Sequence, residues 1–225
     1  MDSSIQVVVF DIGGVMIRLA GGWVSACESA GICYRPFAMT PELRDGFAEL
    51  ERLISTNAIS ISCYGRRAAC LLADLYSPDE IIDIYQAIIR EEHPGIYELV
   101  RQLKQAGVRT ACLSNTCAAH WEDLTNPTLY PGICALDFQH ASHLFGVAKP
   151  DTRIYRHFER ATGFSADEIL FFDDLGDNIE GAHACGWSAE QILASCSPVE
   201  QIYAALPQYG ISLKALASCS CPRRS

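Results

Sequence analysis

The sequence lacks any apolar run of the roughly 18 residues that a membrane-spanning helix needs. Its opening stretch, Met1-Asp2-Ser3-Ser4, is polar and acidic, and the apolar run after it is short, which is not the pattern of a signal peptide. Internal repeats and low-complexity tracts are missing as well. We therefore expect a cytoplasmic globular protein without a membrane partner.

Positive charge is scarce. Lys and Arg together number 17 against 27 Asp and Glu, so the formal net charge is −10. This balance argues against general binding to nucleic acids or to anionic membranes. A small anionic substrate would have to find positive charge at a local site.

Cysteine is plentiful, but the spacing typical of zinc sites is missing. The count of 11 is odd, no CxxC pair occurs, and the close pair Cys219 and Cys221 stands alone. Other cysteines fall in apolar or small-residue segments, which predicts small buried side chains in a reducing cytosol rather than disulfides or zinc ligands. These cysteines are Cys27, Cys70, Cys112 and Cys185.

The remaining composition is that of a packed globular protein. The chain has 225 residues, of which 49% are hydrophobic and 20% charged. This length accommodates one sizeable domain and a smaller one.

A continuous apolar run, from Val7 to Phe10, leads directly into Asp11-Ile12-Gly13-Gly14. Such a run is typical of a strand buried on both faces of a parallel sheet. Open α/β sheets bind ligands in the crevice at the carboxyl ends of their strands, so Asp11 is the first candidate site residue. The two glycines allow a sharp turn and a close approach to a ligand. A simple Asp-x-Gly-Gly turn after a strand would explain the same pattern.

From about Leu19 to Glu91 the pattern is helical throughout. Apolar residues recur at helical spacing at 43–54 and at 68–75. Ser77-Pro78-Asp79-Glu80 predicts the capped start of a helix whose apolar stripe reaches Ile89. Helices without a strand between them predict a separate unit, residues 19–91, inserted into the rest of the chain.

Helices and strands alternate from His93 onward. Strands are predicted at 108–113, at 169–172 and near Gln191 and Ile192, with helices between them. This alternation predicts an α/β fold with a helix-covered parallel sheet, made of residues 1–18 and 92–217. The last residues, 218–225, are expected to form a flexible tail.

Polar residues follow three of the predicted strands, namely Asp11, Ser114 and the pair Asp173-Asp174. A fourth candidate, Lys149, precedes a proline that starts the next helix, and it can point back across the strand ends. Three carboxylates at one crevice repel one another unless a cation joins them. Mg²⁺ suits this arrangement because it prefers oxygen ligands and accepts carboxylates beside water and phosphate.

Four segments, FDIGGV, LSNT, KPD and FFDDLGDN, occur in this order. The set resembles the four motifs of the haloacid dehalogenase-like (HAD) hydrolase superfamily. Within it, residues 93–116, 153–155 and 171–182 are most similar to the bacterial alpha-glucose-1-phosphate phosphatase group and to the N-terminal phosphatase domain of soluble epoxide hydrolases. The resemblance covers the strand-bearing part of the chain and implies a Rossmann-like core with an inserted all-helical cap domain at 19–91.

The resemblance also implies a Mg²⁺-dependent phosphatase acting on a small phosphomonoester, with a sugar phosphate as one option. Asp11 would form an aspartyl-phosphate, and it would bind Mg²⁺ together with the Gly13 carbonyl and Asp174, while Asp173 would support the metal through water. Asn178 belongs either to this metal loop or to the N-cap of the next helix. The residues that would contact substrate are Gly13, Gly14, Ser114, Asn115 and Lys149, with Ser114 and Lys149 stabilising the transferring phosphoryl group.

Gly13 departs from the pattern of most phosphatases in this superfamily, which have a second aspartate there as general acid and base. The alpha-glucose-1-phosphate phosphatase group is similar to this chain in having glycine at that position. A positioned acid/base contributes about 10²–10⁴-fold. Its loss therefore bears on both the rate and the range of leaving groups.

Two other functions stay open. A 2-haloacid dehalogenase needs no leaving-group acid, so Gly13 is compatible with it, but that reaction needs no metal and the pair Asp173-Asp174 argues against it. A catalytically weak regulator that keeps the fold and the site is favoured by Gly13 alone. The expected partner is a small phosphorylated metabolite, and the expected state is a monomer or homodimer. The histidines form no recognisable ligand set, and His120 and His143 are the best candidates to lie near the site.

Overall fold

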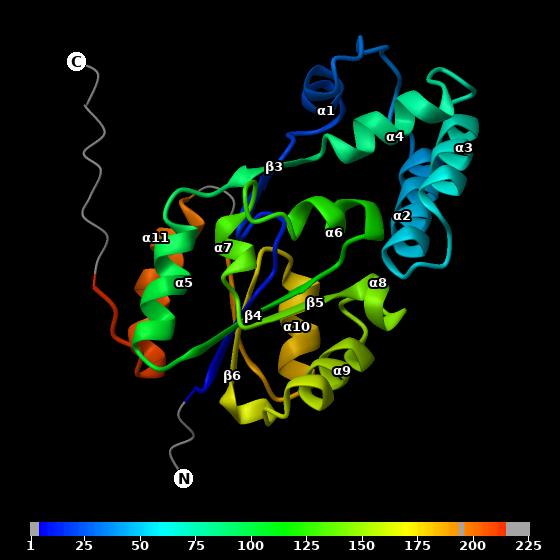
Figure 1. The fold of residues 1–225 in the computed structure, drawn as a ribbon. Helices are drawn as coiled ribbons and strands as arrows, with labels where there is room; N and C mark the ends of the chain where they lie inside the picture. The colour runs from blue at the N-terminus through cyan, green and yellow to red at the C-terminus, as the bar shows by residue number, and fades with distance from the viewer. Residues whose placement is uncertain (1–4, 194–195, 215–225) are drawn as a thin grey trace, which may run out of the picture.

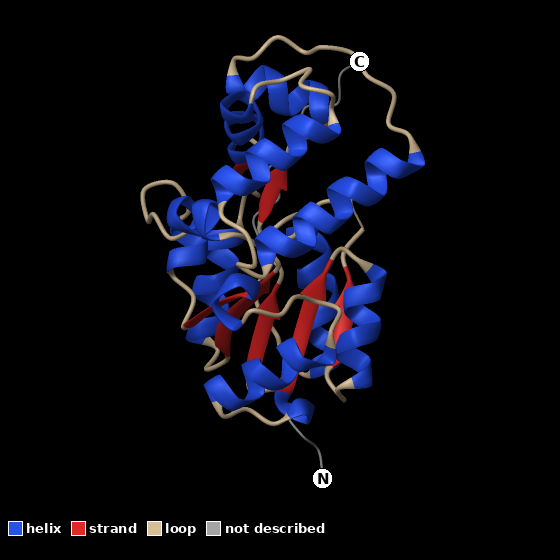
Figure 2. Cartoon of the chain, turned by 90° about the vertical axis from the view of Figure 1, so that its right-hand side faces the viewer, coloured by secondary structure: helices blue, strands red, loops and turns tan. Residues whose placement is uncertain are grey.

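The computed structural model describes residues 5–193 and 196–214, and these residues form a sheet with helices on both faces and a group of helices at one end (Figures 1 and 2). The carboxyl ends of the strands face that group of helices in Figure 2. The predicted α/β architecture is confirmed.

A five-stranded sheet forms the centre of the described part of the chain. Every pair of neighbouring strands is parallel, and Val7 of the central strand is in register with Arg109 and Ile169. The connections run to opposite sides of the central strand, which makes its carboxyl end the expected place for a ligand. In sheet order the strands are β5 (Phe138–Ala141), β4 (Arg109–Ser114), β1 (Val7–Phe10), β6 (Ile169–Asp173) and β7 (Ser188–Gln191).

The side chains of β1 alternate between two helical layers. Val8 and Phe10 belong to the core under α5 (Ile96–Gln105), α7 (Pro131–Cys134) and α11 (Pro198–Ala205). Val7 and Val9 belong to the core under α9 (Thr152–Thr162) and α10 (Gly176–Ala184). Because all four are fully buried, the strand is uniformly apolar instead of alternating with polar residues.

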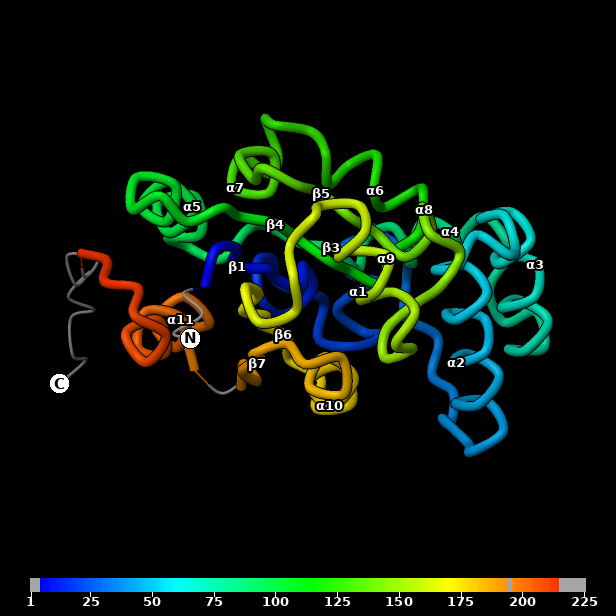
Figure 3. The backbone as a smooth tube through the Cα atoms, turned by 90° about the horizontal axis from the view of Figure 1, so that it is seen from below, coloured from blue at the N-terminus to red at the C-terminus, as the bar shows by residue number. Residues whose placement is uncertain are grey.

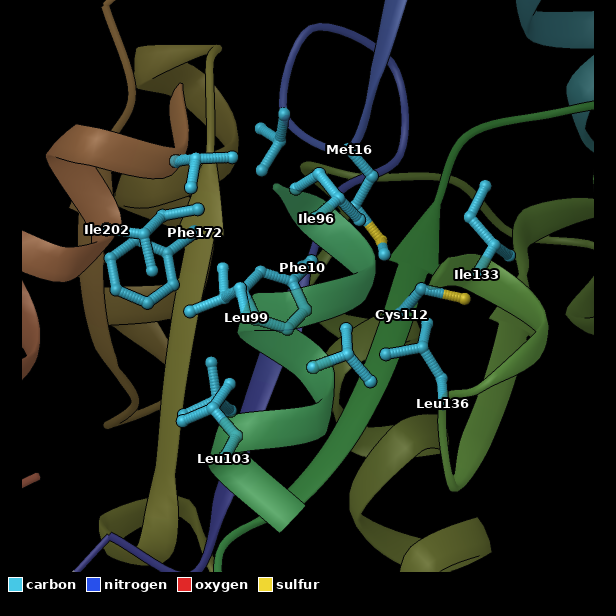
Figure 4. Close-up of a cluster of buried hydrophobic side chains, with 14 of the residues drawn as sticks. Phe10, Met16, Ile96, Leu99, Leu103, Cys112, Ile133, Leu136, Phe172 and Ile202 are labelled. Carbon is cyan, nitrogen blue, oxygen red and sulfur yellow. The ribbon is translucent and has the colours of Figure 1, made fainter. Parts of the chain in front are cut away.

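Figure 4 shows the first of these cores. Phe10, Cys112 and Phe172 come from neighbouring strands; Phe10 and Phe172 lie beside Leu99 of α5, and Cys112 lies towards Ile133 and Leu136. The helical spacing at 96–103 that the sequence displays is therefore the face that α5 buries on the sheet.

Four helices lie between β1 and α5 in the chain, within the fully described stretch 23–86. Figure 3 places α2 and α3 on the opposite side of the molecule from α5 and α11. This group has a core of its own, separate from the two cores of the sheet. The four are α1 (Trp23–Ala30), α2 (Pro41–Ser55), α3 (Ile61–Leu71) and α4 (Pro78–Gln86).

The capped start predicted for α4 is confirmed. Ser77 Oγ accepts a hydrogen bond from the Glu80 amide at 3.2 Å, and the Glu80 carboxylate accepts one from the Ser77 amide at 2.8 Å. Two backbone donors that the helix itself leaves unpaired are satisfied in this way.

The helical pattern expected from Leu19 to Glu91 stops short of both ends. There β2 (Ile17–Leu19) pairs antiparallel with β3 (Ile89–Glu92), and this ribbon joins the helical group to the sheet. The apolar stripe of α4 was expected to reach Ile89, but α4 ends at Gln86. Ile88 and Ile89 continue its spacing by coincidence, because they line a cavity next to the sheet instead.

Cys27, Cys112 and Cys185 are buried as predicted, but Cys70 is exposed. The buried face of α3 is formed by residues 64, 65, 68 and 69, which leaves position 70 on the solvent side. The expected tail at 218–225, with both of its cysteines, lies outside the described residues. Across the described ranges, no helix combines the length and apolar character needed to cross a membrane. The remaining short elements are α6 (Ala118–Leu124), α8 (Ser142–Phe145), η1 (Ala166–Glu168) and η2 (Leu206–Tyr209).

Candidate active site

The polar residues that follow the strands meet at one cavity of about 370 Å³. Asp11 follows β1, Ser114 ends β4, Asp174 follows β6, and Lys149 lies in the loop before α9. The structure therefore brings together side chains that are more than 100 residues apart in the sequence. The predicted site residues that line this cavity are Asp11, Gly13, Ser114, Asn115, Lys149, Asp174 and Asn178.

Lys149 forms the centre of the site. Its Nζ lies 2.9 Å from Asp11 Oδ1 and 2.6 Å from Asp173 Oδ2, and its side chain is fully buried. Burial by itself would lower the pKa of Lys149, but the charges of Asp11 and Asp173 outweigh it and raise that pKa. The lysine is therefore a fixed positive charge next to the Asp11 carboxylate.

Asp173 is held by neighbours on its own side of the site. Asn178 Nδ2 donates to its two carboxylate oxygens at 2.9 and 3.0 Å, and the Leu175 amide donates at 2.9 Å. Asn178 lies inside α10, whose N-cap is Leu175, so the N-cap alternative for Asn178 is wrong. Its amide orients Asp173 towards Lys149.

Asn115 fastens the Lys149 loop to the end of β4. Its Nδ2 donates to the Lys149 carbonyl at 2.9 Å, and its Oδ1 accepts from the Lys149 amide at 2.8 Å. A side-chain amide can pair with a peptide group in this way because it carries the same donor and acceptor. Asn115 thus fixes the position of the Lys149 backbone relative to the end of β4.

Gly14 makes room for Asp174. Its φ is +76°, and a Cβ at this position would lie 2.7 Å from Asp174 Oδ2. Glycine is favoured there both by the left-handed backbone and by the approach of that carboxylate. Gly14 is not among the residues that line the cavity, so its effect on the site passes through Asp174.

The three carboxylates can hold a metal ion. One oxygen from each of Asp11, Asp173 and Asp174 lies within 4.8 Å of the others. Burial raises the pKa of Asp11 to about 6. The charge of Lys149 opposes this rise, and the charge of Asp173 adds to it. Burial and Asp173 also raise the pKa of Asp174. One lysine therefore does not compensate the crowded negative charge, and a divalent cation would.

The oxygen geometry points the same way. Asp11 Oδ1 is buried, and within the described residues it accepts no well-aligned hydrogen bond even though Lys149 Nζ lies 2.9 Å away. A buried carboxylate oxygen with free lone pairs is costly unless something binds it. The donor set fits Mg²⁺, which binds carboxylate and carbonyl oxygens.

The inserted helices contribute the far wall of the cavity, and the sequence did not predict these residues. Glu51, Ser55, Tyr85 and Ile88 line it opposite the strand ends. Glu51 accepts hydrogen bonds from the hydroxyls of Tyr64 at 2.9 Å and Tyr85 at 3.1 Å. The sequence did contain a signal for Glu51. It is a charged residue four positions after Phe47, on the apolar face of α2, where a charged side chain is unexpected.

His120 joins the wall formed by the inserted helices to the sheet region. Its Nε2 lies 2.9 Å from the Tyr85 carbonyl, and its ring stacks on Tyr85 with centroids 4.5 Å apart. Burial lowers the pKa of His120 and so favours the neutral form of the ring. His143 contacts the Thr116 carbonyl at 3.0 Å and does not line the cavity.

Comparison with known families gives one strong match. Residues 5–186 match a family model described as haloacid dehalogenase-like hydrolase. The matched range includes every predicted site residue.

Individual relatives are more distant. The chain is 28% identical over 122 residues to Phosphatase MT3486 of Mycobacterium tuberculosis, covering 49% of this chain and 51% of that protein. It is 32% identical over 111 residues to the Sesquiterpene phosphatase astK of Aspergillus oryzae, covering 46% and 54%. The chain thus spans about half the length of these curated relatives.

A solved structure shares the fold. The HAD family enzyme of Bacteroides thetaiotaomicron, in its magnesium complex, superposes with a TM-score of 0.71 at 17% identity, covering 88% of this chain and 98% of that one. At this identity the similarity establishes the architecture alone.

Proposed function

Because the chain belongs to the haloacid dehalogenase-like hydrolase family, we propose that it is a Mg²⁺-dependent phosphatase acting on a small phosphomonoester. The observation that carries the proposal is the contact of Lys149 with both Asp11 and Asp173, beside a cavity that Asp11, Lys149 and Asp174 line. Such a site offers a nucleophile, a fixed positive charge and a cation site, which are the parts that phosphoryl transfer needs.

The metal would be held by Asp11, Asp174 and the Gly13 carbonyl. It would supply positive charge that neutralises the phosphate and the carboxylates. Asp173 has its oxygens occupied by Lys149, Asn178 and the Leu175 amide, which suits a supporting role and not direct coordination.

Asp11 would act first. One carboxylate oxygen attacks phosphorus, the ester P–O bond breaks, and the alcohol departs and takes a proton from its surroundings. Lys149 favours the ionised form of Asp11 and balances charge on the phosphoryl oxygens, while the Ser114 hydroxyl donates to one of them. Water then attacks phosphorus, the acyl-phosphate bond breaks, and Asp11 and inorganic phosphate are released.

The named relatives support this class of reaction, because both are phosphatases by name and one is named for a sesquiterpene. The dehalogenase alternative receives no support from the site. Displacement of halide from carbon needs no metal ion. It therefore does not account for the carboxylates of Asp173 and Asp174, which lie beside Asp11 in one cluster.

The test is hydrolysis of p-nitrophenyl phosphate with MgCl₂ and with EDTA. We expect turnover with Mg²⁺, loss of turnover with EDTA, and an inactive but folded Asp11→Asn variant. The matched control is Asp45→Asn, the same chemical change at an exposed position of α2, which should keep full activity. Full activity of Asp11→Asn would exclude this mechanism.

Two further outcomes decide between the alternatives. Chloride release from 2-chloropropionate in the absence of metal would establish the dehalogenase function. The absence of activity in both the phosphatase and the dehalogenase assay would favour the regulatory function.

A further inference from the structure

A second cavity, of about 300 Å³, lies within the inserted helices. Its volume is at the lower end of the range for small-molecule sites, which is about 300–1,000 Å³. The wall is mostly hydrocarbon, contributed by side chains of all four inserted helices, α1 to α4. The aromatic and aliphatic residues that line it include Trp23, Phe47, Tyr64, Ile81, Ile84 and Tyr85.

This cavity adjoins the candidate active site. Glu51, Tyr85 and Ile88 line both cavities, so the two cavities share a wall to which these residues contribute. A molecule with its phosphate at Asp11 would therefore direct its other end towards the inserted helices.

Three polar groups of the second cavity are already paired with one another. The Glu51 carboxylate accepts hydrogen bonds from the hydroxyls of Tyr64 and Tyr85. Arg44 contributes a cation, but it is an exposed residue of α2. A sugar bound here would leave several hydroxyls without partners, and each would lose its hydrogen bonds to water.

We propose that the cavity within the inserted helices binds an apolar leaving group, a hydrocarbon moiety, of the phosphate ester whose phosphoryl group lies at Asp11 and Lys149. This inference rests on the proposed phosphatase function. It selects hydrophobic phosphomonoesters over sugar phosphates, and it gives the inserted helices the task of recognising the part of the substrate that departs.

The test uses 4-n-alkylphenyl phosphates from methyl to octyl, because their phenols have nearly equal pKa values and differ only in apolar length. With Mg²⁺ present, kcat/KM should rise about fourfold for each buried methylene until the chain fills the cavity, and should then level off. Alpha-glucose 1-phosphate should be hydrolysed at least tenfold less efficiently than the best aryl ester. A flat series, or a preference for the sugar phosphate, would overturn the proposal.

The Ala26→Phe variant tests whether this cavity is the site. Ala26 is buried on α1 and lines the cavity, so a phenyl ring there should occupy its space. We expect kcat/KM to fall at least tenfold more for the octyl ester than for the methyl ester, so that the dependence on chain length is lost. The matched control is Val24→Phe, on the exposed side of the same helix, which should leave the whole series unchanged. Equal effects of the two variants would show that the cavity is not the binding site.

A binding measurement separates this inference from the proposed function. Alkylphosphonates cannot be hydrolysed, and calorimetry with methyl- to octylphosphonate in MgCl₂ reports affinity without turnover. Affinity that rises with chain length and falls in Ala26→Phe would support the cavity as the site even if no ester were hydrolysed. Turnover of p-nitrophenyl phosphate with length-independent phosphonate binding would support the phosphatase and refute the apolar site.

Discussion

Lys149 Nζ donates to Asp173 Oδ2 over 2.6 Å, and both side chains are fully buried. A buried ion pair is stable only when its remaining hydrogen-bonding groups are satisfied. Asn178 and the Leu175 amide meet that need for Asp173. Under the proposed function, Asp173 is therefore a positioning residue, which would act on the chemistry by holding Lys149 against Asp11.

The first prediction concerns that pair. Lys149→Met would leave the Asp11 and Asp173 carboxylates buried without their cation, so we expect a loss of about 3–5 kcal/mol in the free energy of unfolding. Urea denaturation in EDTA, which removes any divalent ion, measures it. Adding Asp173→Asn to Lys149→Met should recover part of the loss. Arg153→Met, which breaks an exposed pair with Asp151, is the control and should cost less than about 1 kcal/mol.

The second prediction concerns Gly14. Gly14→Ala adds a Cβ at φ +76° and 2.7 Å from Asp174 Oδ2, so Asp174 must move. The control is Gly107→Ala, which has a φ of +82° with no atom within 4 Å of the added Cβ. Both variants should lose about 1–2 kcal/mol of stability from the left-handed backbone. Gly14→Ala alone should also raise the Mg²⁺ concentration needed for half-maximal activity, and equal Mg²⁺ titrations would contradict the role assigned to Gly14.

The site residues at the strand ends could be predicted because a short stretch of sequence marks each of them. An apolar run followed by Asp11, Ser114 or Asp173 marks a strand and its end, and parallel strands place their carboxyl ends together. The contacts that each residue makes within the site could not be predicted. The contact of Asn178 with Asp173 and the approach of Gly14 to Asp174 depend on loop geometry that no spacing reveals.

The half contributed by the inserted helices could not be predicted, since it depends on how they pack against the sheet. Glu51, Tyr85 and His120 meet at the cavity only because that packing brings α2, α4 and α6 together. The strand β5 was not predicted for a separate reason. Its four residues, Phe-Gln-His-Ala, form neither an apolar run nor a strict alternation of apolar and polar residues, and three of them are only half-buried.

The third prediction is a pH dependence of stability. Burial raises the pKa of Glu51 in the folded state above its ordinary value of 4.5, so the folded chain holds this proton more tightly than the unfolded chain. As the pH rises above that value, the unfolded state loses the proton first and wild-type stability falls. Glu51→Gln removes this contribution. Its free energy of unfolding relative to wild type should therefore increase between pH 4 and pH 7 in urea denaturation.

The control for this comparison is Glu122→Gln, which makes the same change at an exposed position of α6. Its stability relative to wild type should not change between the two pH values. A Glu51→Gln variant that tracked wild type at both pH values would show that burial does not affect the ionisation of Glu51.

The last prediction follows from Gly13, where many related phosphatases carry an acid. Without a donor at this position, log kcat/KM should fall steeply as the leaving-group pKa rises across a series of aryl and alkyl phosphates. Gly13→Asp should flatten that slope by supplying the acid. The atoms nearest to a Cβ at this position belong to the Leu19 side chain, the nearest at 3.1 Å, and a flexible side-chain end can yield. A shallow slope in the wild type would mean that another residue protonates the leaving group. Glu51 and His120 line the cavity, so the same series measured on Glu51→Gln and on His120→Gln would then identify the donor as the variant in which the slope steepens.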